Sequence, residues 1–549
     1  MKIRFTAIVL STLLCACAAH AQDQFNGIAF FMGDPTPGKA QPRYESFVQQ
    51  IKQQPNSTNV FIDYREPIWS SGTYAAQWRN NAAWHAGELA KLCSAEHLNR
   101  LDAEGRPDIT PMVSIGLTDD HRAYRRNLPP SDPNYGKYSE AEAVRMMQDI
   151  ANGKYDLDDP ATGRYRVWPA IFDAFRNTGF RKIYLRIGWE QNGDWYGWQV
   201  RSDATQAAYL AAWRHVATVA RNYAIAHGMT IETVWSPTAS YTNHGIAEES
   251  SYPGDSYVDI VAPTAYSPIW NATRSPDGTA YYDWSSGQNV SLSQWLANPV
   301  NRSQIWDYPA ADYWNPQRGW GVPAAISFAM EHGKPFGFSE TGTGNAGVTP
   351  RGGGPADEGA YPLYLAQRLA AGAQQGLQLR MVEIWAQPSG SDDATFLSGL
   401  RPLEARGWKE FGGIMAAVQA QKDVARGKPA YASSTRSGSP ASHALDGSTA
   451  THWSSVPGDD KQWIYVDLGQ RYPISRVRLS WDVAHASEYT IQTLTSGTTW
   501  TTIYQTSAGD GGVDDINGLA GLGRYVRIFA HKRGTLLKNY QLRELEVYP

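Results

Sequence analysis

Short apolar runs recur between Gly27 and about Glu410 and are separated by longer segments in which apolar residues have helical spacing, such as 203–227 and 361–375. Eight runs predict buried β-strands, at 27–31, 59–64, 109–115, 182–187, 231–235, 258–266, 335–340 and 380–385. Eight β/α units over about 390 residues predict an α/β fold, a (β/α)8 TIM barrel with long loops. A doubly wound sheet is the alternative, but it fits eight units less well, and no Gly-rich phosphate loop follows the first run.

The alternation of side chains within these runs separates two faces. In the fourth run one face carries Arg186 and Glu190 and the other is aliphatic, and the eighth run places Glu383 and Trp385 on one face. A mixed face toward the barrel interior and an aliphatic face toward surrounding helices would explain this pattern. Barrel active sites lie at the carboxyl ends of the strands. We expect four residues there: Glu190, Tyr266, Glu340 and Trp385.

The pattern changes after residue 418. Residues 419–429 form a short stretch of mixed charge, which we interpret as a linker. Residues 430–549 are rich in Ser, Thr and Gly and carry short alternating runs without a helical stretch. Such spacing predicts an all-β sandwich domain.

The first 21 residues have the pattern of an export signal. Lys2 and Arg4 precede an apolar stretch, and Ala19-His20-Ala21 supplies small residues at the cleavage positions. We therefore expect a secreted or periplasmic protein, with the barrel domain at 22–418; anchoring as a lipoprotein is the alternative. Two of the three cysteines lie in this segment, which leaves Cys93 and predicts a mature chain without an internal disulfide.

The composition limits the classes of partner that the protein can be expected to bind. Removal of Lys2 and Arg4 from the 49 basic residues leaves 47 against 53 acidic ones, a net charge of −6. This charge argues against nucleic acid and, more weakly, against strongly anionic polymers. No apolar run after the signal reaches membrane-spanning length. The 21 Trp residues exceed what a core usually needs, and flat amphipathic rings are suited to stacking on sugars, although a large core would also use many of them.

The segment after the fourth run combines a carboxylate with an amide and several aromatic rings. Glu190 is followed by Asn192 and by two tryptophans, Trp195 and Trp198. A second carboxylate, Glu340, ends the seventh run, and a pair of carboxylates at strand ends is what a glycosidase requires. An ion-pair role is the alternative for each. The other carboxylates near strand ends are Asp63, Glu66, Asp119, Asp120 and Glu383, the last of which we interpret mainly as a partner of Arg186. His85, His121 and His244 lack the paired spacing of metal ligands, and no nucleophile elbow is present.

Together, these residues resemble a known family. The pattern Arg186-x-x-x-Glu190-x-Asn192-Gly-x-Trp195-x-x-Trp198 is similar to the fourth-strand motif of glycoside hydrolase family 26, which contains β-mannanases and β-1,3-xylanases. The resemblance implies a retaining enzyme on a (β/α)8 barrel, with Glu190 as acid/base and Glu340 as nucleophile. It also implies that Tyr266 orients the nucleophile and that Trp385 lies beneath the scissile sugar. Arg186, Trp189, Asn192, Trp195, Trp198 and Trp235 are further candidates for substrate contact.

One position departs from this motif. The mannanases have His immediately before the acid/base, where it contacts the sugar, and this chain has Trp189. An indole ring does not offer the same hydrogen bonds, so the backbone sugar stays open between β-mannan and β-1,3-xylan types.

The C-terminal segment resembles the discoidin-like (F5/8 type C) sandwiches, including carbohydrate-binding module family 32. The resemblance rests on Asp446-Gly…Thr451-x-Trp453, on residues 463–469 and on residues 544–548. It implies a structural calcium held by Asp446, Thr451 and Glu546, with a calcium-free turn as the alternative. Trp481, His485, Tyr489 and Arg533 are weaker candidates for sugar contact.

These observations predict a secreted retaining endo-β-glycanase joined to a carbohydrate-binding module. We expect a monomer that needs no cofactor for catalysis and whose partner is a polysaccharide, held by two linked modules. A hydrolase of a bacterial exopolysaccharide and a non-catalytic glycan-binding protein are the alternatives.

Overall fold

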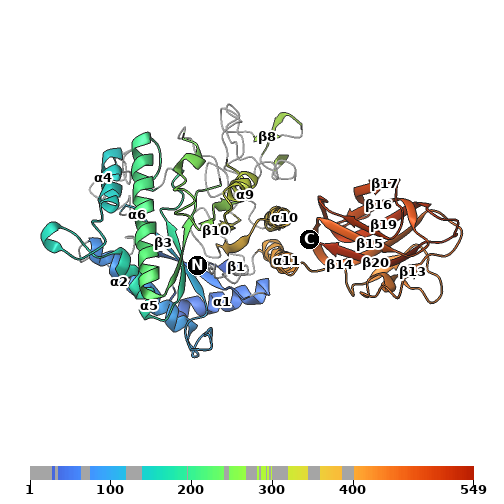
Figure 1. The fold of residues 1–549 in the computed structure, drawn as a ribbon, viewed down its shortest axis with the longest axis horizontal. Helices are drawn as coiled ribbons and strands as arrows, with labels where there is room; N and C mark the ends of the chain where they lie inside the picture. Colours follow the sequence, from blue (N-terminus) through green and yellow to red (C-terminus); the bar gives the residue numbers. More distant parts are fainter. Residues whose placement is uncertain are drawn as a thin grey trace, which may run out of the picture.

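The computed structural model describes residues 28–30, 35–52, 54–62, 74–118, 139–193, 196–239, 246–267, 281–283, 286–291, 294–295, 298, 320–343, 359–385 and 401–549. Figure 1 shows an α/β barrel on one side and an all-β sandwich on the other, next to helices α10 (Ala360–Gln374) and α11 (Pro402–Gln419). The predicted export signal at 1–21 lies outside the described residues, and its cleavage and the resulting location stay predictions.

The barrel sheet is parallel throughout. Its strands are β1 (Ile28–Phe30), β2 (Ser57–Ile62), β3 (Thr110–Ile115), β4 (Lys182–Ile187), β5 (Thr230–Trp235), β6 (Ile260–Val261), β7 (Thr264–Tyr266), β10 (Phe336–Gly342) and β11 (Leu379–Ile384). They follow the order β1-β11-β10-β6-β5-β4-β3-β2, with β7 paired to β10. Because the end strands β1 and β2 lie against each other, the sheet is nearly closed. The predicted α/β barrel is confirmed.

The sixth barrel strand is interrupted. We predict one run at 258–266, and the structure divides it into β6 and β7 around Ala262 and Pro263. Proline has no backbone N–H, so it cannot donate to the strand ladder. Thr264 instead donates its N–H to the carbonyl of Pro237, beyond the end of β5. The strand therefore continues past the break, and β7 pairs with β10 as β6 does.

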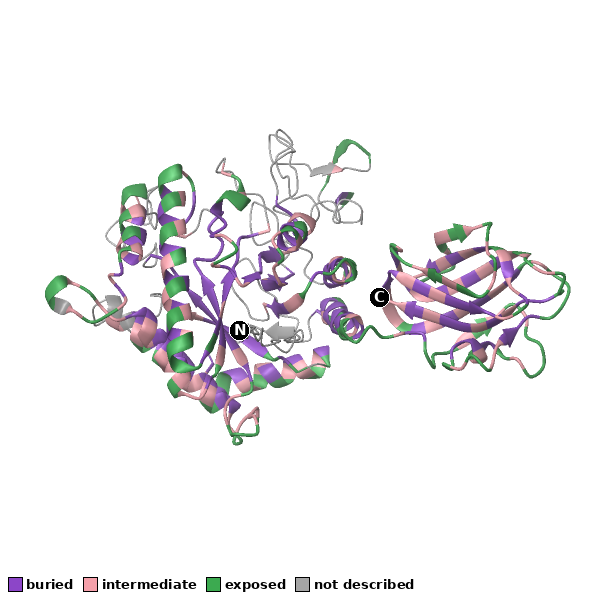
Figure 2. Ribbon diagram, viewed as in Figure 1, coloured by how far each residue is buried: buried purple, intermediate pink, exposed green. Residues whose placement is uncertain are grey.

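Helices cover the outside of the sheet. Besides α10 and α11, the structure contains α1 (Pro37–Ile51), α2 (Tyr74–Cys93), α4 (Glu140–Ala151), α5 (Trp168–Asn177), α6 (Asp203–His227) and α9 (Val322–Glu331). The longest, α6, begins with a capping box between Ser202 and Thr205 and ends at Gly228 in the left-handed conformation. Such caps contribute about 1 kcal/mol each because they satisfy backbone groups at the helix ends. Figure 2 shows the buried faces of these helices turned toward the sheet.

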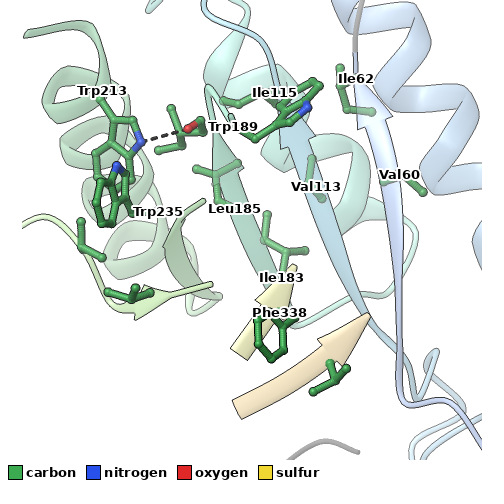
Figure 3. Close-up of a cluster of buried hydrophobic side chains, with 14 of the residues drawn as sticks. Val60, Ile62, Val113, Ile115, Ile183, Leu185, Trp189, Trp213, Trp235 and Phe338 are labelled. Atoms are coloured by element: carbon green, nitrogen blue, oxygen red, sulfur yellow. Dashed lines mark hydrogen bonds between the residues drawn. The ribbon is translucent and has the colours of Figure 1, made fainter. Parts of the chain in front are cut away.

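The strand alternation creates two cores in the barrel. Outside the sheet, Ile183 and Leu185 of β4 pack with the helices in the main hydrophobic cluster, as Figure 3 shows. Inside the sheet, Tyr184 lies in a small separate cluster with Met112, Val234, Ile260, Ala262 and Met381. The predicted division into an aliphatic outer face and a mixed inner face is therefore what the structure has.

The C-terminal sandwich consists of two antiparallel sheets. One has the order β12 (Ala430–Ala432), β14 (Gln462–Ile474), β19 (Gly521–Arg533), β16 (Ala486–Leu494) and β17 (Thr501–Thr506). The other has the order β13 (Trp453–Ser454), β20 (Gln541–Tyr548), β15 (Arg476–Trp481) and β18 (Val513–Ile516). The inner faces enclose a core of their own. Two short strands, β8 (Tyr281–Asp283) and β9 (Gln288–Val290), form a separate hairpin in the barrel half.

Polar contacts join the sandwich to the barrel. Arg471 on β14 pairs with Glu410 on α11 at 2.8 Å between Nη2 and Oε2. Gln374 on α10 donates its amide to the carbonyl of Pro549 at 2.8 Å. Cys93 is buried and free. Within the described part of the chain, none of the helices has both the length and the apolar character needed to cross a membrane.

Candidate active site

A tight left-handed turn places Glu190 at the end of β4. Gly188 has φ 49° and Glu190 has φ 52°. A Cβ on Gly188 would lie 2.7 Å from Cδ1 of Leu117, so the position excludes larger residues. The N–H of Glu190 donates to the carbonyl of Ser236 at 2.7 Å, which fixes the turn against the end of β5. A non-glycine residue at positive φ costs about 1 kcal/mol or more, and such strain concentrates at functional sites.

The carboxyl of Glu190 is directed toward β7. The Thr264 hydroxyl donates to its Oε1 at 2.7 Å. Glu190 is 9% exposed, so its carboxyl is shielded from bulk water but still reachable. This surrounding suits a group that transfers a proton to or from a bound ligand.

Glu340 lies on β10, and two donors hold its carboxyl. The hydroxyl of Tyr266 donates to Oε1 at 2.5 Å. Nη1 of Arg186 donates to Oε2 at 3.0 Å. Charge-assisted hydrogen bonds of this kind are roughly twice as strong as neutral ones and fix orientation. The predicted contact between Tyr266 and Glu340 is thus present in the structure.

Thr264 connects the two carboxylates. Its backbone is the register partner of Glu340 in the β7–β10 pair, and its side chain binds Glu190. Neighbouring strands lie about 4.8 Å apart. The two glutamates, 150 positions apart in the sequence, therefore face one common space at the barrel mouth.

Arg186 is fully buried at the base of this space, and two serines support it. Its Nε donates to Oγ of Ser236 at 3.0 Å, and the Ser236 hydroxyl lies 2.7 Å from that of Ser339. The guanidinium also lies over the Trp189 ring, 5.3 Å from its centroid. We did not predict Ser236, Ser339 or Thr264; each is a small polar residue one or two positions from a predicted site residue.

Glu383, which we predict mainly as a partner of Arg186, lies beneath the pair; the charge of Arg186 acts on it, but among the described residues no ion pair joins the two. Both of its carboxyl oxygens are buried, and Asn59 is the hydrogen-bonding residue beside them. Burial raises the pKa of Glu383 well above its usual range, and the negative charge of Glu340 acts in the same direction, against the opposing charge of Arg186. Arg186 forms its ion pair with Glu340, at 3.0 Å between Nη1 and Oε2.

Three residues near Glu190 that we predict as substrate contacts are instead buried and bonded within the protein. Trp189 is 1% exposed and makes edge contacts with Phe61 and Trp198. Trp198 is buried and donates its indole N–H to the carbonyl of Trp189 at 2.7 Å. The amide of Asn192 is occupied on both sides by the backbone of Thr238, at 2.9 and 2.8 Å. These three predicted substrate contacts form the frame of the turn.

Other predicted aromatic residues separate into three groups. Trp235 is fully buried and packs against Tyr252 and Trp320, in the core between sheet and helices, so the structure gives it no place at the barrel mouth. Trp385 is partly exposed. Its backbone N–H donates to the backbone carbonyl of Thr341, the residue after Glu340. The third group lies outside the described residues and consists of Trp195, Tyr241 and Trp270. The same holds for the predicted carboxylates Asp63, Glu66, Asp119 and Asp120 and for the histidines His121 and His244.

The predicted calcium turn has a different acidic partner. Asp446 accepts hydrogen bonds from the Thr451 hydroxyl at 2.7 Å and from the Ser448 N–H at 2.8 Å. The carboxyl beside Asp446 is that of Glu544, and burial together with Asp446 raises the pKa of Glu544 to about 7. Glu546 is instead paired with Arg478 at 2.5 Å. Two facing carboxyls suit a calcium ion, but the described residues contain no group of three His, Cys, Asp or Glu that could hold a metal. Calcium stays a prediction.

Two of the weaker candidates for sugar contact lie in the sandwich interior. Trp481 and Tyr489 are 5% and 1% exposed, and both donate to Oδ2 of Asp514. Arg533 lies at the loop end of β19 and pairs with Asp460 at 2.7 Å. His485 is close to Gly511 and Gly534, where a Cβ would meet its ring.

Comparison with known proteins adds two family matches. Residues 175–284 match the model of glycosyl hydrolase family 26, and residues 429–545 match the F5/8 type C domain. Endoglucanase H from Acetivibrio thermocellus is 33% identical over 99 residues, which is 17% of this chain and 10% of that enzyme. The chain thus spans about a tenth of the length of this curated relative.

Solved structures resemble the C-terminal part. Chitosan-binding module 1 of a chitosanase/glucanase from Paenibacillus sp. IK-5 is 47% identical; the match covers 23% of this chain and 99% of that module, with a TM-score of 0.23. The family 32 carbohydrate-binding module of NanJ from C. perfringens, solved with galactose, is 21% identical over 22% of this chain and 93% of that module, with a TM-score of 0.21.

The family matches confirm both predicted resemblances. The segment matched to family 26 contains Arg186, Glu190 and Tyr266, and it identifies a glycosyl hydrolase domain, the predicted enzyme class. The second match identifies the sandwich as an F5/8 type C domain. Glu340 and Trp385 lie beyond the matched segment and depend on the geometry above.

Proposed function

We propose that the chain is a retaining endo-β-glycanase, in which the barrel cuts a polysaccharide backbone and the sandwich holds the enzyme on that polysaccharide. One observation supports this most directly. Thr264 holds Glu190 while Tyr266 and Arg186 hold Glu340, so that two carboxyls face one space at the barrel mouth. Retaining glycosidases need two such groups about 5–5.5 Å apart.

Glu340 is the proposed nucleophile. Its carboxylate attacks the anomeric carbon, and the bond from that carbon to the leaving oxygen breaks, which gives a covalent glycosyl-enzyme. Tyr266 and Arg186 restrict the carboxyl to one orientation, so the attack does not require a search among rotamers. When water later hydrolyses the glycosyl-enzyme ester, Tyr266 and Arg186 again donate hydrogen bonds to the released carboxylate of Glu340.

Glu190 is the proposed acid/base. It gives its proton to the leaving glycosidic oxygen in the first step and takes a proton from water in the second, when that water attacks the anomeric carbon. The left-handed turn directs its carboxyl into the space shared with Glu340, and the Thr264 hydroxyl holds it there. The two steps need only these side chains and water, so no cofactor is part of the proposal.

The substrate we propose is a β-mannan or a β-1,3-xylan type backbone. The resemblance of the fourth-strand motif to family 26 supports both, and Trp189 in place of the mannanase His disfavours mannan. The name of the relative, an endoglucanase, supports an endo mode of action. Trp385 completes the proposal as the floor beneath the sugar at the cleavage point. Export to the periplasm or medium, where such polymers occur, agrees with the N-terminal pattern.

The sandwich is proposed to raise the local concentration of the barrel on its substrate. Two linked modules that bind one polymer gain avidity without a tight catalytic site. The match to the F5/8 type C domain supports a carbohydrate-binding role for residues 430–549.

The experiment that tests this function is a product assay on purified full-length protein with β-mannan, β-1,3-xylan, mixed-linkage β-glucan and bacterial exopolysaccharides. Release of oligosaccharides from one of them, first as the β-anomer by NMR, is the expected result. Glu340→Ala should abolish release and leave retention on the polymer unchanged. Retention without release from any of these polymers would instead favour the non-catalytic glycan-binding alternative. An α-anomer as the first product would contradict the retaining mechanism.

A further inference from the structure

The sandwich has an outward aromatic surface that the catalytic proposal does not use. On the five-stranded sheet, Ile464 and Val466 of β14 face the core, so Trp463 and Tyr465 face outward. Tyr431 of β12 is the register partner of Tyr465 and is 50% exposed. Figure 2 shows the strands of the sandwich alternating between buried and less buried positions.

These outward rings form a continuous row. The ring centroids of Tyr431 and Tyr465 lie 5.1 Å apart with an interplanar angle of 26°. Those of Trp463 and Tyr465 lie 5.5 Å apart at 25°. Trp500, at the far side of the loop between β16 and β17, lies 5.7 Å from Tyr465. Because these rings stack on one another, a sugar ring would contact their outer edges and the faces at the ends of the row.

A groove of about 580 Å³ runs beside this row. Trp463 and Tyr465 line one side of it, residues 494–498 and Trp500 line the other, and Arg524, Tyr525 and Arg527 of β19 line its base. Such a volume falls in the range of ligand sites. The glutamates of the barrel mouth are not part of it.

The two arginines at the base differ in their partners. Arg524 is neutralised by Asp467 through two hydrogen bonds of 2.7 and 2.8 Å. Arg527 donates to the neutral amide oxygen of Gln492 at 2.8 and 2.6 Å, and its guanidinium lies 4.1 Å from the ring centroid of Trp500. Desolvation lowers the pKa of Arg527, and no nearby carboxylate opposes that effect. Among the ion pairs of the described residues, Arg527 has none.

We propose that this groove binds an acidic polysaccharide, with a hexuronate ring stacked on the aromatic row and its carboxylate on the Arg527 guanidinium. Gln492 accepts from Nε and Nη2, and no hydrogen bond is found for Nη1 among the described residues, so Nη1 can donate to a carboxylate. A carboxylate there would offset the cost of a partly desolvated cation without a counter-ion. The net charge of −6 expected for the chain without its export signal argues weakly against anionic polymers, but exposed charges more than about 8 Å from the groove are largely screened in physiological salt, so the local charge of Arg527 has the larger effect.

The groove is distinct from the loop end of the same domain. Arg533 and Arg527 lie on the same strand, β19, but Arg533 is at the end beside Asp460 and Arg527 is in the middle of the sheet face. The inference therefore goes beyond the proposed catalytic function and does not depend on it. Binding of an acidic chain at the loop end would be a different site.

The test is calorimetric titration of the full chain with hexamannuronate and, as the neutral counterpart, mannohexaose, at 20 and 200 mM NaCl. Hexamannuronate should bind more tightly, with weaker binding at 200 mM NaCl. Arg527→Gln and Trp500→Ala should each weaken it at least tenfold, and Arg527→Lys should weaken it less than Arg527→Gln. A melting temperature within a few degrees of that of the wild type shows that a variant is folded. If one of the two variants does not fold, the other still tests the proposal.

Matched controls separate the groove from other surfaces. Arg533→Gln removes an arginine from the loop end of β19, and Arg476→Gln removes one from the opposite sheet, where it pairs with Asp515 at 2.7 Å. Arg476→Gln is the control that should leave uronate binding unchanged, and Arg533→Gln tests the loop end as the rival site. The proposal is overturned if Arg533→Gln abolishes binding while Arg527→Gln does not, or if neutral and acidic hexamers bind equally. It is also overturned if Trp500→Ala turns a dimer into a monomer, which would make this face a contact between copies.

Discussion

Thr264 donates its hydroxyl to Glu190 while its backbone pairs in register with Glu340. One residue thus sets the relative position of two carboxyls that come from different strands. Beyond Pro263, β7 keeps both neighbours of the sixth strand, because it pairs in register with β10 and Thr264 also bridges Thr238 past the end of β5. The catalytic proposal rests on this contact, and it can be probed without touching either glutamate.

Replacing Thr264 with Val keeps the shape of the side chain and removes its hydroxyl. A hydrogen bond to a charged group contributes about 1.5–3 kcal/mol, so kcat should fall about 10- to 100-fold. Thr264→Ser should restore most of the rate. Steady-state kinetics on the polymer that the panel identifies would check this, and a Val variant as active as the wild type would show that the contact has no role in catalysis.

Tyr266→Phe removes one of the two donors to Glu340 and leaves Arg186 in place. We expect a lower kcat, again by about 10- to 100-fold, because the nucleophile loses part of its orientation. KM and the melting temperature should change little. Tyr361→Phe is a matched control, since that tyrosine donates to the carbonyl of Ala265 behind the same strand. If both variants lose activity equally, the effect of Tyr266 is structural.

The sequence predicts the barrel and its two glutamates because strand ends and carboxylates are local signals. It wrongly predicts that Trp235 contacts the substrate. The alternation of side chains along this strand already indicates that Trp235 points away from the barrel interior. Val234 lies in the inner cluster, so its neighbour Trp235 points outward to the helices. Ser236 and Ser339 could not be identified, because their role depends on which strands become neighbours.

The acidic partner of Asp446 was also beyond the sequence. β15 and β20 pair regularly through Ser480 and Glu544, so Glu544 and Glu546 lie on the same face of β20. Glu546 is the register partner of Arg478 and pairs with it, and Glu544 is the carboxyl beside Asp446. Which of the two glutamates meets Asp446 depends on this strand pairing, which the sequence alone does not reveal.

Glu383→Gln should reduce the pH dependence of stability. Burial raises the pKa of Glu383 in the folded state, so its favourable contribution is fully present below the unfolded pKa of about 4.3 and is lost as the pH rises toward the folded value. Glutamine has the shape of the neutral acid and does not titrate. Calorimetry from pH 5 to pH 8 should show the melting temperature of the variant improving relative to the wild type, and parallel curves would mean that Glu383 is ionised.

The same reasoning applies to Glu544, whose pKa is raised to about 7 beside Asp446. Stability of the sandwich should fall as the pH rises from about 4.3 through 7, and Glu544→Gln should remove that fall. Calcium added at pH 8 should raise the melting temperature of the wild type, because two facing carboxylates then gain a counter-ion. Glu546→Gln, which breaks the pair with Arg478, should keep the calcium response. A wild type that does not respond to calcium or to a chelator would end the calcium prediction.

The most direct test of the central claim is chemical rescue by azide, with an aryl β-glycoside of the sugar that the product assay identifies. In a variant without the nucleophile, azide attacks the anomeric carbon of the substrate directly. In a variant without the acid/base, azide attacks the anomeric carbon of the glycosyl-enzyme. Glu340→Ala with azide should therefore give the α-glycosyl azide, and Glu190→Ala with azide the β-glycosyl azide, as read by NMR. The reverse assignment, or no rescue of either variant, would contradict the roles given to Glu340 and Glu190.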